Sequence, residues 1–339
     1  MKLNFYPYTI TLKDQFTISV NSRSTTPAIM VEVEHNGFTG YGEASLPPYL
    51  QENQPSVINF LNEINFNSLN YHTDIDQILD YVDNLSIGNN AAKAAIDIAL
   101  YDLFGKINNI SLSKFLNIKL RDDIYTSFTL GISDVEKLKQ KIFEASDYKF
   151  LKIKLGTDND RKIISNIREL TDKQLYVDIN QGWKDKYVAL DTINWLASKN
   201  VALVEQPLPK ENAEDAKWLK ERSPLPIIAD EAVQTSEDLD VIRETYSGVN
   251  VKLMKVGGIR QAIKMIKKAR KLDLKIMLGC MTETSCAITA ASHLSSLVDW
   301  VDLDGAELIS NDLFRGTKID KGKLVVPDSP GLGIEKLLK

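Results

Sequence analysis

Residues 150–206 read FLKIKLGTDNDRKIISNIRELTDKQLYVDINQGWKDKYVALDTINWLASKNVALVEQ. Within this stretch, short apolar runs at Phe150–Leu155, Leu175–Ile179 and Val201–Val204 alternate with longer segments that have helical spacing of apolar residues. Such alternation predicts parallel strands joined by helices, because a strand covered by helices is apolar along most of its length. The stretch therefore indicates consecutive βα units.

The same pattern continues on both sides of this stretch. Further apolar runs lie at Ile124–Leu130, Ile227–Ala229, Val249–Met254, Ile276–Leu278 and Val298–Leu303. Eight runs that alternate with helical segments predict an α/β fold closed into a (β/α) barrel, rather than an open sheet.

A smaller α+β domain is expected before the barrel. Strand-like alternation over Ala28–Glu34 leads through the turn sequence His35-Asn36-Gly37 into another strand. Residues 89–105 have a polar start, strong helix formers and a final glycine, which predicts a helix, and residues 55–85 also have a helical pattern. We expect the α+β domain at residues 1–120, the barrel at 121–311, and a C-terminal segment, 312–339, that returns to the N-terminal sheet.

The composition is that of a globular protein with a large apolar core. The chain has 339 residues, of which 43% are hydrophobic and 26% are charged, which excludes a disordered chain and a short disulfide scaffold. Its formal net charge is −5, and the absence of a basic block argues against nucleic acid as a partner. No stretch approaches the roughly 18 apolar residues of a membrane span, so we expect a cytoplasmic protein without a membrane partner.

Cysteine and histidine provide no obvious catalytic or metal-binding cluster. Cys280 and Cys286 are too few for a thiolate metal site, and they fit a reducing compartment. His35, His72 and His293 are scattered along the chain. Acid–base chemistry is therefore not expected to depend on imidazole.

Side-chain parity predicts charged residues inside the barrel. If the apolar residues of each strand face the helices, alternate residues face inward. These inward residues are Lys152, Lys154, Asp178, Asn180, Glu205, Asp230, Asn250, Lys252, Asp302 and Asp304. Charges inside a barrel are costly unless they are paired or bind an ion, and the carboxyl ends of barrel strands carry the active sites of such enzymes.

Three of the inward residues form a candidate Mg²⁺ site. Asp178, Glu205 and Asp230 are 27 and 25 residues apart, each the length of one βα unit, so they end consecutive strands at the same height. Carboxylate oxygens are hard ligands that suit Mg²⁺. The alternative is a structural ion network with the neighbouring lysines.

The lysines flank these acids on two sides. Lys152 and Lys154 precede them, and Lys252 lies across the barrel, which fits proton transfer at both faces of a carbon held between. We expect Lys152 and Lys154, together with the metal, to lower each other's pKa toward a value useful for a base. Lys255, after the strand, is interpreted as a solvated residue at the rim, and it is the alternative to Lys252 as a catalyst.

Together these segments resemble the muconate-lactonizing-enzyme subgroup of the enolase superfamily. The resemblance rests on Lys152-Ile-Lys154, Val177-Asp-Ile-Asn-Gln-Gly-Trp183, Val204-Glu-Gln-Pro207, Ala229-Asp-Glu-Ala232, Asn250-Val-Lys-Leu-Met-Lys-Val-Gly-Gly258, Tyr41-Gly-Glu43 and the helix Ala94–Gly105. It implies a (β/α)7β TIM-like barrel with an N-terminal α+β capping domain. It also implies Mg²⁺ on Asp178, Glu205 and Asp230, with Lys154 and Lys252 as the acid/base catalysts.

The last strand points to a subgroup within this family. Asp302-Leu-Asp304 is similar to the Asp-x-Asp motif of dipeptide epimerases, including L-Ala-D/L-Glu epimerase, and the pair would hold a substrate ammonium group. The implied reaction is 1,1-proton transfer at the α-carbon of the C-terminal residue of a dipeptide. Gly279–Glu283 resembles the end of the family's seventh strand, so we expect Glu283 to orient groups around Lys252 and Lys152 to contact substrate.

The cap loop, Phe16–Pro27, departs from the family pattern. Asn21 stands where glutamate-specific members often carry an arginine. Arg23, two residues later, either supplies this cation to the substrate or is a solvated loop residue.

Several other functions use parts of the same pattern. An o-succinylbenzoate synthase-like or muconate cycloisomerase-like lyase would use the same lysines and metal, although neither substrate has an ammonium group for Asp302 and Asp304. A Schiff-base aldolase would need one lysine and leaves the carboxylates unexplained. A metal-binding module that lost activity is the further alternative, although every catalytic position of the family pattern is occupied. The oligomeric state is open, a homo-oligomer included.

Overall fold

The computed structural model describes residues 1–19, 21–69 and 74–337. Val20, residues 70–73, which include His72, and Leu338–Lys339 lie outside the described residues.

In the described part of the chain, eight parallel strands form one sheet in sequence order. They are β4 (Ser127–Leu130), β5 (Phe150–Lys154), β6 (Gln174–Asp178), β7 (Val201–Glu205), β8 (Ile227–Ala229), β9 (Gly248–Val251), β10 (Lys275–Gly279) and β11 (Trp300–Asp302). Each overlaps one of the apolar runs in the sequence, and the predicted barrel is confirmed.

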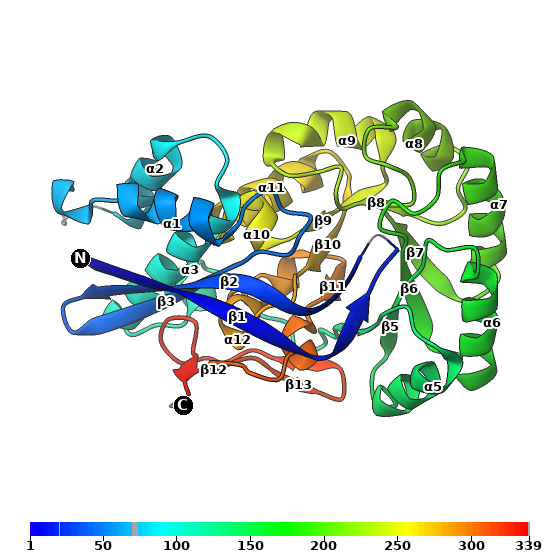
Figure 1. Ribbon diagram of the computed structural model, residues 1–339. Coiled ribbons are helices and arrows are strands. Elements are labelled where there is room, and N and C mark those ends of the chain that lie inside the picture. The colour runs from blue at the N-terminus through cyan, green and yellow to red at the C-terminus, as the bar shows by residue number, and fades with distance from the viewer. Residues whose placement is uncertain (20, 70–73, 338–339) are drawn as a thin grey trace.

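Helices surround this sheet on its outer face (Figure 1). They are α5 (Val135–Glu144), α6 (Asp160–Leu170), α7 (Lys186–Ala197), α8 (Ala213–Lys220), α9 (Leu239–Thr245), α11 (Ile259–Lys271) and α12 (Ser285–Ser292). Short 3₁₀ turns lie at η2 (Ser236–Asp238), η3 (Ser295–Leu297) and η4 (Gly305–Leu308). The apolar faces of the helices pack on the strands, which leaves the strand ends to carry the polar site.

The predicted strand at Val249–Met254 continues into a helix. The run Val249–Met254 is a strand only to Val251, and a short helix, α10 (Leu253–Val256), follows directly. Leu253 and Met254 are buried in this helix. An apolar run of this length does not distinguish a buried strand from a buried helical turn.

Side-chain hydrogen bonds link β4 and β11, where the two ends of the sheet meet. The Ser127 hydroxyl donates to Asp302 Oδ1 at 2.7 Å, and the backbone N–H of Thr129 donates to Asp304 Oδ2 at 2.6 Å. The backbone N–H of Leu303 donates to the Thr126 hydroxyl at 2.7 Å. The aspartates of the last strand therefore help to close the barrel.

The N-terminal domain combines an antiparallel sheet with helices. Strands β1 (Lys2–Thr17), β2 (Ser22–His35) and β3 (Phe38–Ser45) form the sheet, and Asn36 and Gly37 between β2 and β3 both have positive φ, as a tight hairpin turn requires. The helical elements are α1 (Gln54–Glu63), η1 (Phe66–Ser68), α2 (Ile75–Leu85), α3 (Asn90–Ile107) and α4 (Leu112–Phe115). Helix α3 packs closely on β3: a Cβ at Gly42 would lie 1.9 Å from the Ala95 carbonyl oxygen.

The C-terminal segment lies against the N-terminal domain. Its short strands pair as β12 (Phe314–Arg315) with β15 (Glu335–Lys336) and as β13 (Lys318–Asp320) with β14 (Lys323–Val325). The rings of Phe314 and Tyr41 are 5.3 Å apart, and Lys336 Nζ is 2.5 Å from Glu32 Oε1.

The hairpin between β1 and β2 reaches from its own sheet to the mouth of the barrel (Figure 1). The Ile132 N–H donates to the Thr17 carbonyl at 2.9 Å, and the Ser19 hydroxyl donates to the Ile179 carbonyl at 3.1 Å. Residues of the N-terminal domain thus contribute to the space above the strand ends. No helix among the described residues has the length and apolarity needed to cross a bilayer.

Candidate active site

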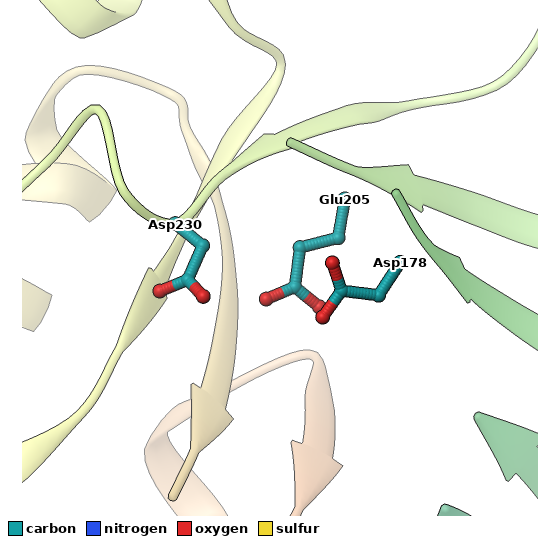
Figure 2. Close-up of side chains that lie close together, drawn as sticks. All are labelled: Asp178, Glu205 and Asp230. Atoms are coloured by element: carbon teal, nitrogen blue, oxygen red, sulfur yellow. The ribbon is translucent and has the colours of Figure 1, made fainter. Parts of the chain in front are cut away.

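Three carboxylates converge at the ends of adjacent strands (Figure 2). Asp178 is paired with Glu205 across the β6–β7 ladder, and Asp230 directly follows β8. Oxygen atoms of these three residues lie within 4.8 Å of one another. The equal spacing in the sequence therefore reflects an equal height on the barrel.

This cluster fits a divalent cation. All three side chains are buried, and Lys152 Nζ, 2.8 Å from Glu205 Oε2, is a single ammonium group set against three carboxylates. Buried anionic oxygens need a compensating cation, and hard oxygen ligands favour Mg²⁺. Asp178, Glu205 and Asp230 could hold such an ion.

Lysines compensate these charges from two sides. Lys154 Nζ is 2.5 Å from Asp178 Oδ2, and Lys252 Nζ is 2.7 Å from Asp230 Oδ2. Lys154 ends β5, and Lys252 follows β9. In the sheet order these strands are separated by β6, β7 and β8 on one side and by β10, β11 and β4 on the other, so the two lysines lie on opposite walls.

Lys152 lies deeper, between the acids of both walls. Its Nζ is 2.7 Å from Asp302 Oδ2, 2.8 Å from Glu205 Oε2 and 3.3 Å from Asp178 Oδ2. Burial by itself would lower the pKa of Lys152, but the three carboxylates raise it well above its ordinary value. Among the protein's own groups, the acids therefore outweigh the neighbouring lysine.

Neighbouring opposite charges also shift the pKa values of Asp178 and Lys252. Burial would raise the pKa of Asp178, but the charges of Lys154 and Lys152 lower it. Burial would lower the pKa of Lys252, but Asp230 raises it well above its ordinary value. The site is thus a network of mutually compensating charges.

The interpretation of Lys255 as a solvated rim residue is wrong. Its side chain is buried, with 1% of its surface exposed, and Nζ is 2.6 Å from Asp230 Oδ1 and 2.7 Å from the Asp230 carbonyl oxygen. The turn of α10 brings Lys255 back against Asp230. Lys252, in contrast to Lys255, lines a cavity at the mouth of the barrel, which Lys154 and Asp230 also line.

Asp302 and Asp304 both line this cavity. Asp302 is paired with Lys152, as described above, so a lysine of the protein already compensates its charge. Asp304 accepts hydrogen bonds from the backbone and the hydroxyl of Thr129 at 2.6 and 3.1 Å. Burial and the charge of Asp302 raise the pKa of Asp304 to about 7.

Arg23 lines the same cavity from the β1–β2 hairpin. Its Nε donates to the Thr26 hydroxyl at 3.2 Å, and its guanidinium lies 5.4 Å from the centre of the Phe16 ring. Burial lowers the pKa of Arg23, and no carboxylate of the described residues forms an ion pair with it. The side chain is half-buried rather than fully solvated.

Two further side chains of this region are those of Glu283 and Tyr49. Glu283 is buried behind the cavity wall, where Oε1 accepts from the Met281 N–H at 3.0 Å, and burial raises the pKa of Glu283 to about 7. Tyr49, which the sequence did not single out, lies over Lys252 with its hydroxyl 3.4 Å from Nζ. No charge or motif marks this tyrosine in the sequence, because the N-terminal domain alone positions it.

The chain resembles known proteins along almost its whole length. Residues 8–117 match "Mandelate racemase / muconate lactonizing enzyme, N-terminal domain", and residues 134–336 match "Enolase C-terminal domain-like". The L-Ala-D/L-Glu epimerase of Bacteroides thetaiotaomicron is 46% identical over 338 residues, which cover 99% of this chain and 88% of that protein.

Solved structures show the same architecture. A substrate-liganded complex of the L-Ala-D/L-Glu epimerase from Bacillus subtilis superposes with a TM-score of 0.91 at 27% identity, covering 98% of both chains. The dipeptide epimerase from Enterococcus faecalis, complexed with Mg and the dipeptide L-Leu-L-Tyr, has a TM-score of 0.89 at 30% identity, again covering 98% of both chains. This chain therefore belongs to the mandelate racemase and muconate lactonizing enzyme family of the enolase superfamily.

Proposed function

We propose that the protein is a Mg²⁺-dependent dipeptide epimerase that moves a proton at the α-carbon of the C-terminal residue, with L-Ala-D/L-Glu as substrate. One observation carries this proposal: Lys154 and Lys252 come from opposite walls of the barrel and line one cavity beside the three carboxylates. A carbon held between two such amines can lose a proton from one face and gain one on the other.

The two lysines divide the reaction by face. For one enantiomer, Lys154 removes the α-proton and Lys252 delivers a proton to the opposite face; for the other, the roles are exchanged. A divalent cation on Asp178, Glu205 and Asp230 would neutralise negative charge on the substrate carboxylate. Lys152, held by Asp302 and Glu205, adds a fixed positive charge next to this position.

Other residues of the cavity would select the substrate. Asp304, with Asp302 behind it, attracts the ammonium group of a dipeptide. Arg23, a cation that lines the cavity from the β1–β2 hairpin, is suited to the side-chain carboxylate of a glutamate. Glu283 would orient groups around Lys252. The names of the relatives described above support this choice of substrate.

Epimerisation of L-Ala-L-Glu tests the proposal. The enzyme with Mg²⁺ should convert L-Ala-L-Glu to L-Ala-D-Glu, as resolved by chiral chromatography, and EDTA should abolish conversion until Mg²⁺ is restored. Asp178→Asn should be inactive while the circular dichroism spectrum stays that of the wild type. Full activity in EDTA would exclude the metal, and conversion of neither enantiomer would exclude the function.

The N-acetyl derivative of L-Ala-L-Glu separates the epimerase from a lyase on the same site. Acetylation removes the ammonium group and leaves Asp304 without a cation, so kcat/KM should fall by about tenfold or more. Equal kcat/KM values would remove the ammonium-binding role and favour the lyase alternative.

A further inference from the structure

Arg23 reaches the catalytic cavity, the one that Lys154 and Lys252 line, with only part of its guanidinium group engaged. Its Nε donates to the Thr26 hydroxyl at 3.2 Å. The two terminal nitrogens form no hydrogen bond with a described residue, and they are not enclosed by protein atoms. These nitrogens are therefore free to bind a carboxylate that enters the cavity, while Nε holds the guanidinium group in place.

Thr26 is a buried residue that contacts Arg23 but does not line the cavity. Its side chain is fully enclosed, and Thr282 is buried as well. The hydroxyl groups of these two threonines lie 2.7 Å apart, and only Thr282 lines the cavity. A buried hydroxyl without a partner is costly, so each of the two hydroxyl groups fixes the position of the other.

Thr282 ties this pair to the barrel. It follows β10, which ends at Gly279, and its carbonyl oxygen accepts a hydrogen bond from the Ser45 hydroxyl at 2.8 Å. Thr26 belongs to β2 and Ser45 ends β3, so two strands of the N-terminal domain hold the same point of the barrel. The guanidinium group of Arg23 is thereby fixed relative to the strand ends, and not to the hairpin alone.

An irregularity in the hairpin brings Arg23 and Thr26 together. Residues three apart on a regular strand point to opposite faces, but the register of β1 and β2 shifts between Thr11 and Phe16, and Phe16 is the partner of Arg23. Such a bulge changes the direction of the side chains beside it. The guanidinium group lies 5.4 Å from the centre of the Phe16 ring, so the ring and the Thr26 hydroxyl both restrain it.

We propose that Thr26 and Thr282 are positioning residues for Arg23, and that their buried hydroxyl groups set the preference for a dipeptide whose second side chain carries a carboxylate. This inference rests on the proposed function, which assigns Arg23 to that carboxylate. Without the threonine pair, each substrate would have to order the Arg23 side chain, which costs affinity. This cost applies only to side chains that Arg23 binds.

Thr26→Val removes the hydroxyl and keeps the branched shape of the side chain. The wild type should prefer L-Ala-L-Glu over L-Ala-L-Gln, which has the same shape but no side-chain charge. In Thr26→Val the ratio of the two kcat/KM values should fall about fivefold, through a higher KM for L-Ala-L-Glu. A threonine that only supports the fold would change both substrates alike, so an unchanged ratio would overturn the inference.

Two matched variants separate the hydroxyl from the side chain that carries it. Thr26→Ser keeps the hydroxyl and should retain the wild-type ratio within about twofold. Thr25→Val makes the same change at the neighbouring, exposed position of β2 and should leave both kcat/KM values within about twofold of the wild type. A ratio as low in either of these variants as in Thr26→Val would contradict the role of the Thr26 hydroxyl.

A double variant tests whether Thr26 acts through Arg23. In Arg23→Met the ratio should already be low, and the addition of Thr26→Val should lower it no further, because both substitutions remove the same interaction. A further fall would contradict the inference. If Thr26→Val does not fold, Thr282→Val gives the test from the barrel side: the ratio should fall, and an unchanged ratio would overturn the proposal.

The wild type separates failure of this inference from failure of the proposed function. Conversion of L-Ala-L-Glu and L-Ala-L-Gln with equal kcat/KM would reject the role of Arg23 and of its threonine anchor, but would leave the protein a dipeptide epimerase. Conversion of neither dipeptide would reject both proposals.

Discussion

The four lysines of the site differ because each contacts different acids. Lys154 and Lys252 have one carboxylate partner each at the cavity surface, whereas Lys152 is enclosed by several. Lys255 is bound to the far side of Asp230. The two proposed catalysts therefore differ from the other lysines in their position at the cavity, not in residue type.

Lys255→Met should affect both substrate enantiomers alike. Lys255 does not line the catalytic cavity, so its loss disturbs Asp230 rather than one face of the substrate. The α-proton exchange rates of L-Ala-L-Glu and L-Ala-D-Glu in D₂O should both fall, with their ratio within about twofold of the wild-type ratio. Lys264→Met, at an exposed lysine of α11, serves as the control. A loss confined to one enantiomer would make Lys255 a catalyst.

Substrate affinity should depend on the protonation of Asp304. Its pKa is raised to about 7 by burial and by Asp302, so the carboxylate is charged above this pH and neutral below it. KM for L-Ala-L-Glu should rise as the pH falls through about 7, because a neutral acid attracts an ammonium group less strongly. Asp304→Asn should have a KM about tenfold higher and lack this pH step. If the pH step in KM persists in Asp304→Asn, another group causes it.

At the scale of elements, the strands were predictable and the connections between them were not. Apolar runs located every barrel strand, and parity placed Asp178, Glu205 and Asp230 together, because both signals are local and repeat with the period of the strand. The end of β9 was not predictable, since the apolar residues of α10 continue the run. Tyr49 and the contact of Lys255 with Asp230 depend on packing between distant segments, which leaves no local pattern.

The close packing of α3 on β3 predicts a large effect of a small substitution. Gly42→Ala would place a Cβ 1.9 Å from the Ala95 carbonyl oxygen, so one of the two backbones must move. We expect a loss of about 2–3 kcal/mol in the free energy of unfolding. Gly37→Ala, where no atom lies within 4 Å of the added Cβ but φ is +80°, should cost about 1 kcal/mol. Urea denaturation measures both, and equal losses would contradict the packing argument.

At the scale of the whole molecule, a buried histidine ties three regions together. His293, after α12, accepts a hydrogen bond at Nδ1 from the Ser113 N–H, 3.2 Å away in α4. Its Nε2 lies 3.1 Å from the Leu332 carbonyl in the C-terminal segment. Since Nδ1 accepts, Nε2 carries the proton and donates it, so the ring is neutral. This histidine has a structural role far from the acidic cluster, as the scattered histidines in the sequence suggested.

The neutral state of His293 predicts acid sensitivity. Burial lowers the pKa of His293 to about 4, below the ordinary value near 6.5 that applies to the unfolded chain. The unfolded chain therefore binds the proton more readily, and stability present above pH 6.5 is lost as the pH falls toward 4. Between pH 7 and pH 5 the wild type should lose about 2 kcal/mol more than His293→Gln in urea denaturation. Equal losses would show that the ring titrates normally.

The central claim is that two lysines on opposite walls serve opposite faces of one carbon. The most direct measurement is α-proton exchange in D₂O, followed by mass spectrometry, for L-Ala-L-Glu and L-Ala-D-Glu with Lys154→Ala and Lys252→Ala. Each variant should retain exchange with one enantiomer and lose it with the other, and the two variants should have opposite preferences. Exchange of both enantiomers at wild-type rates in either variant would contradict the claim.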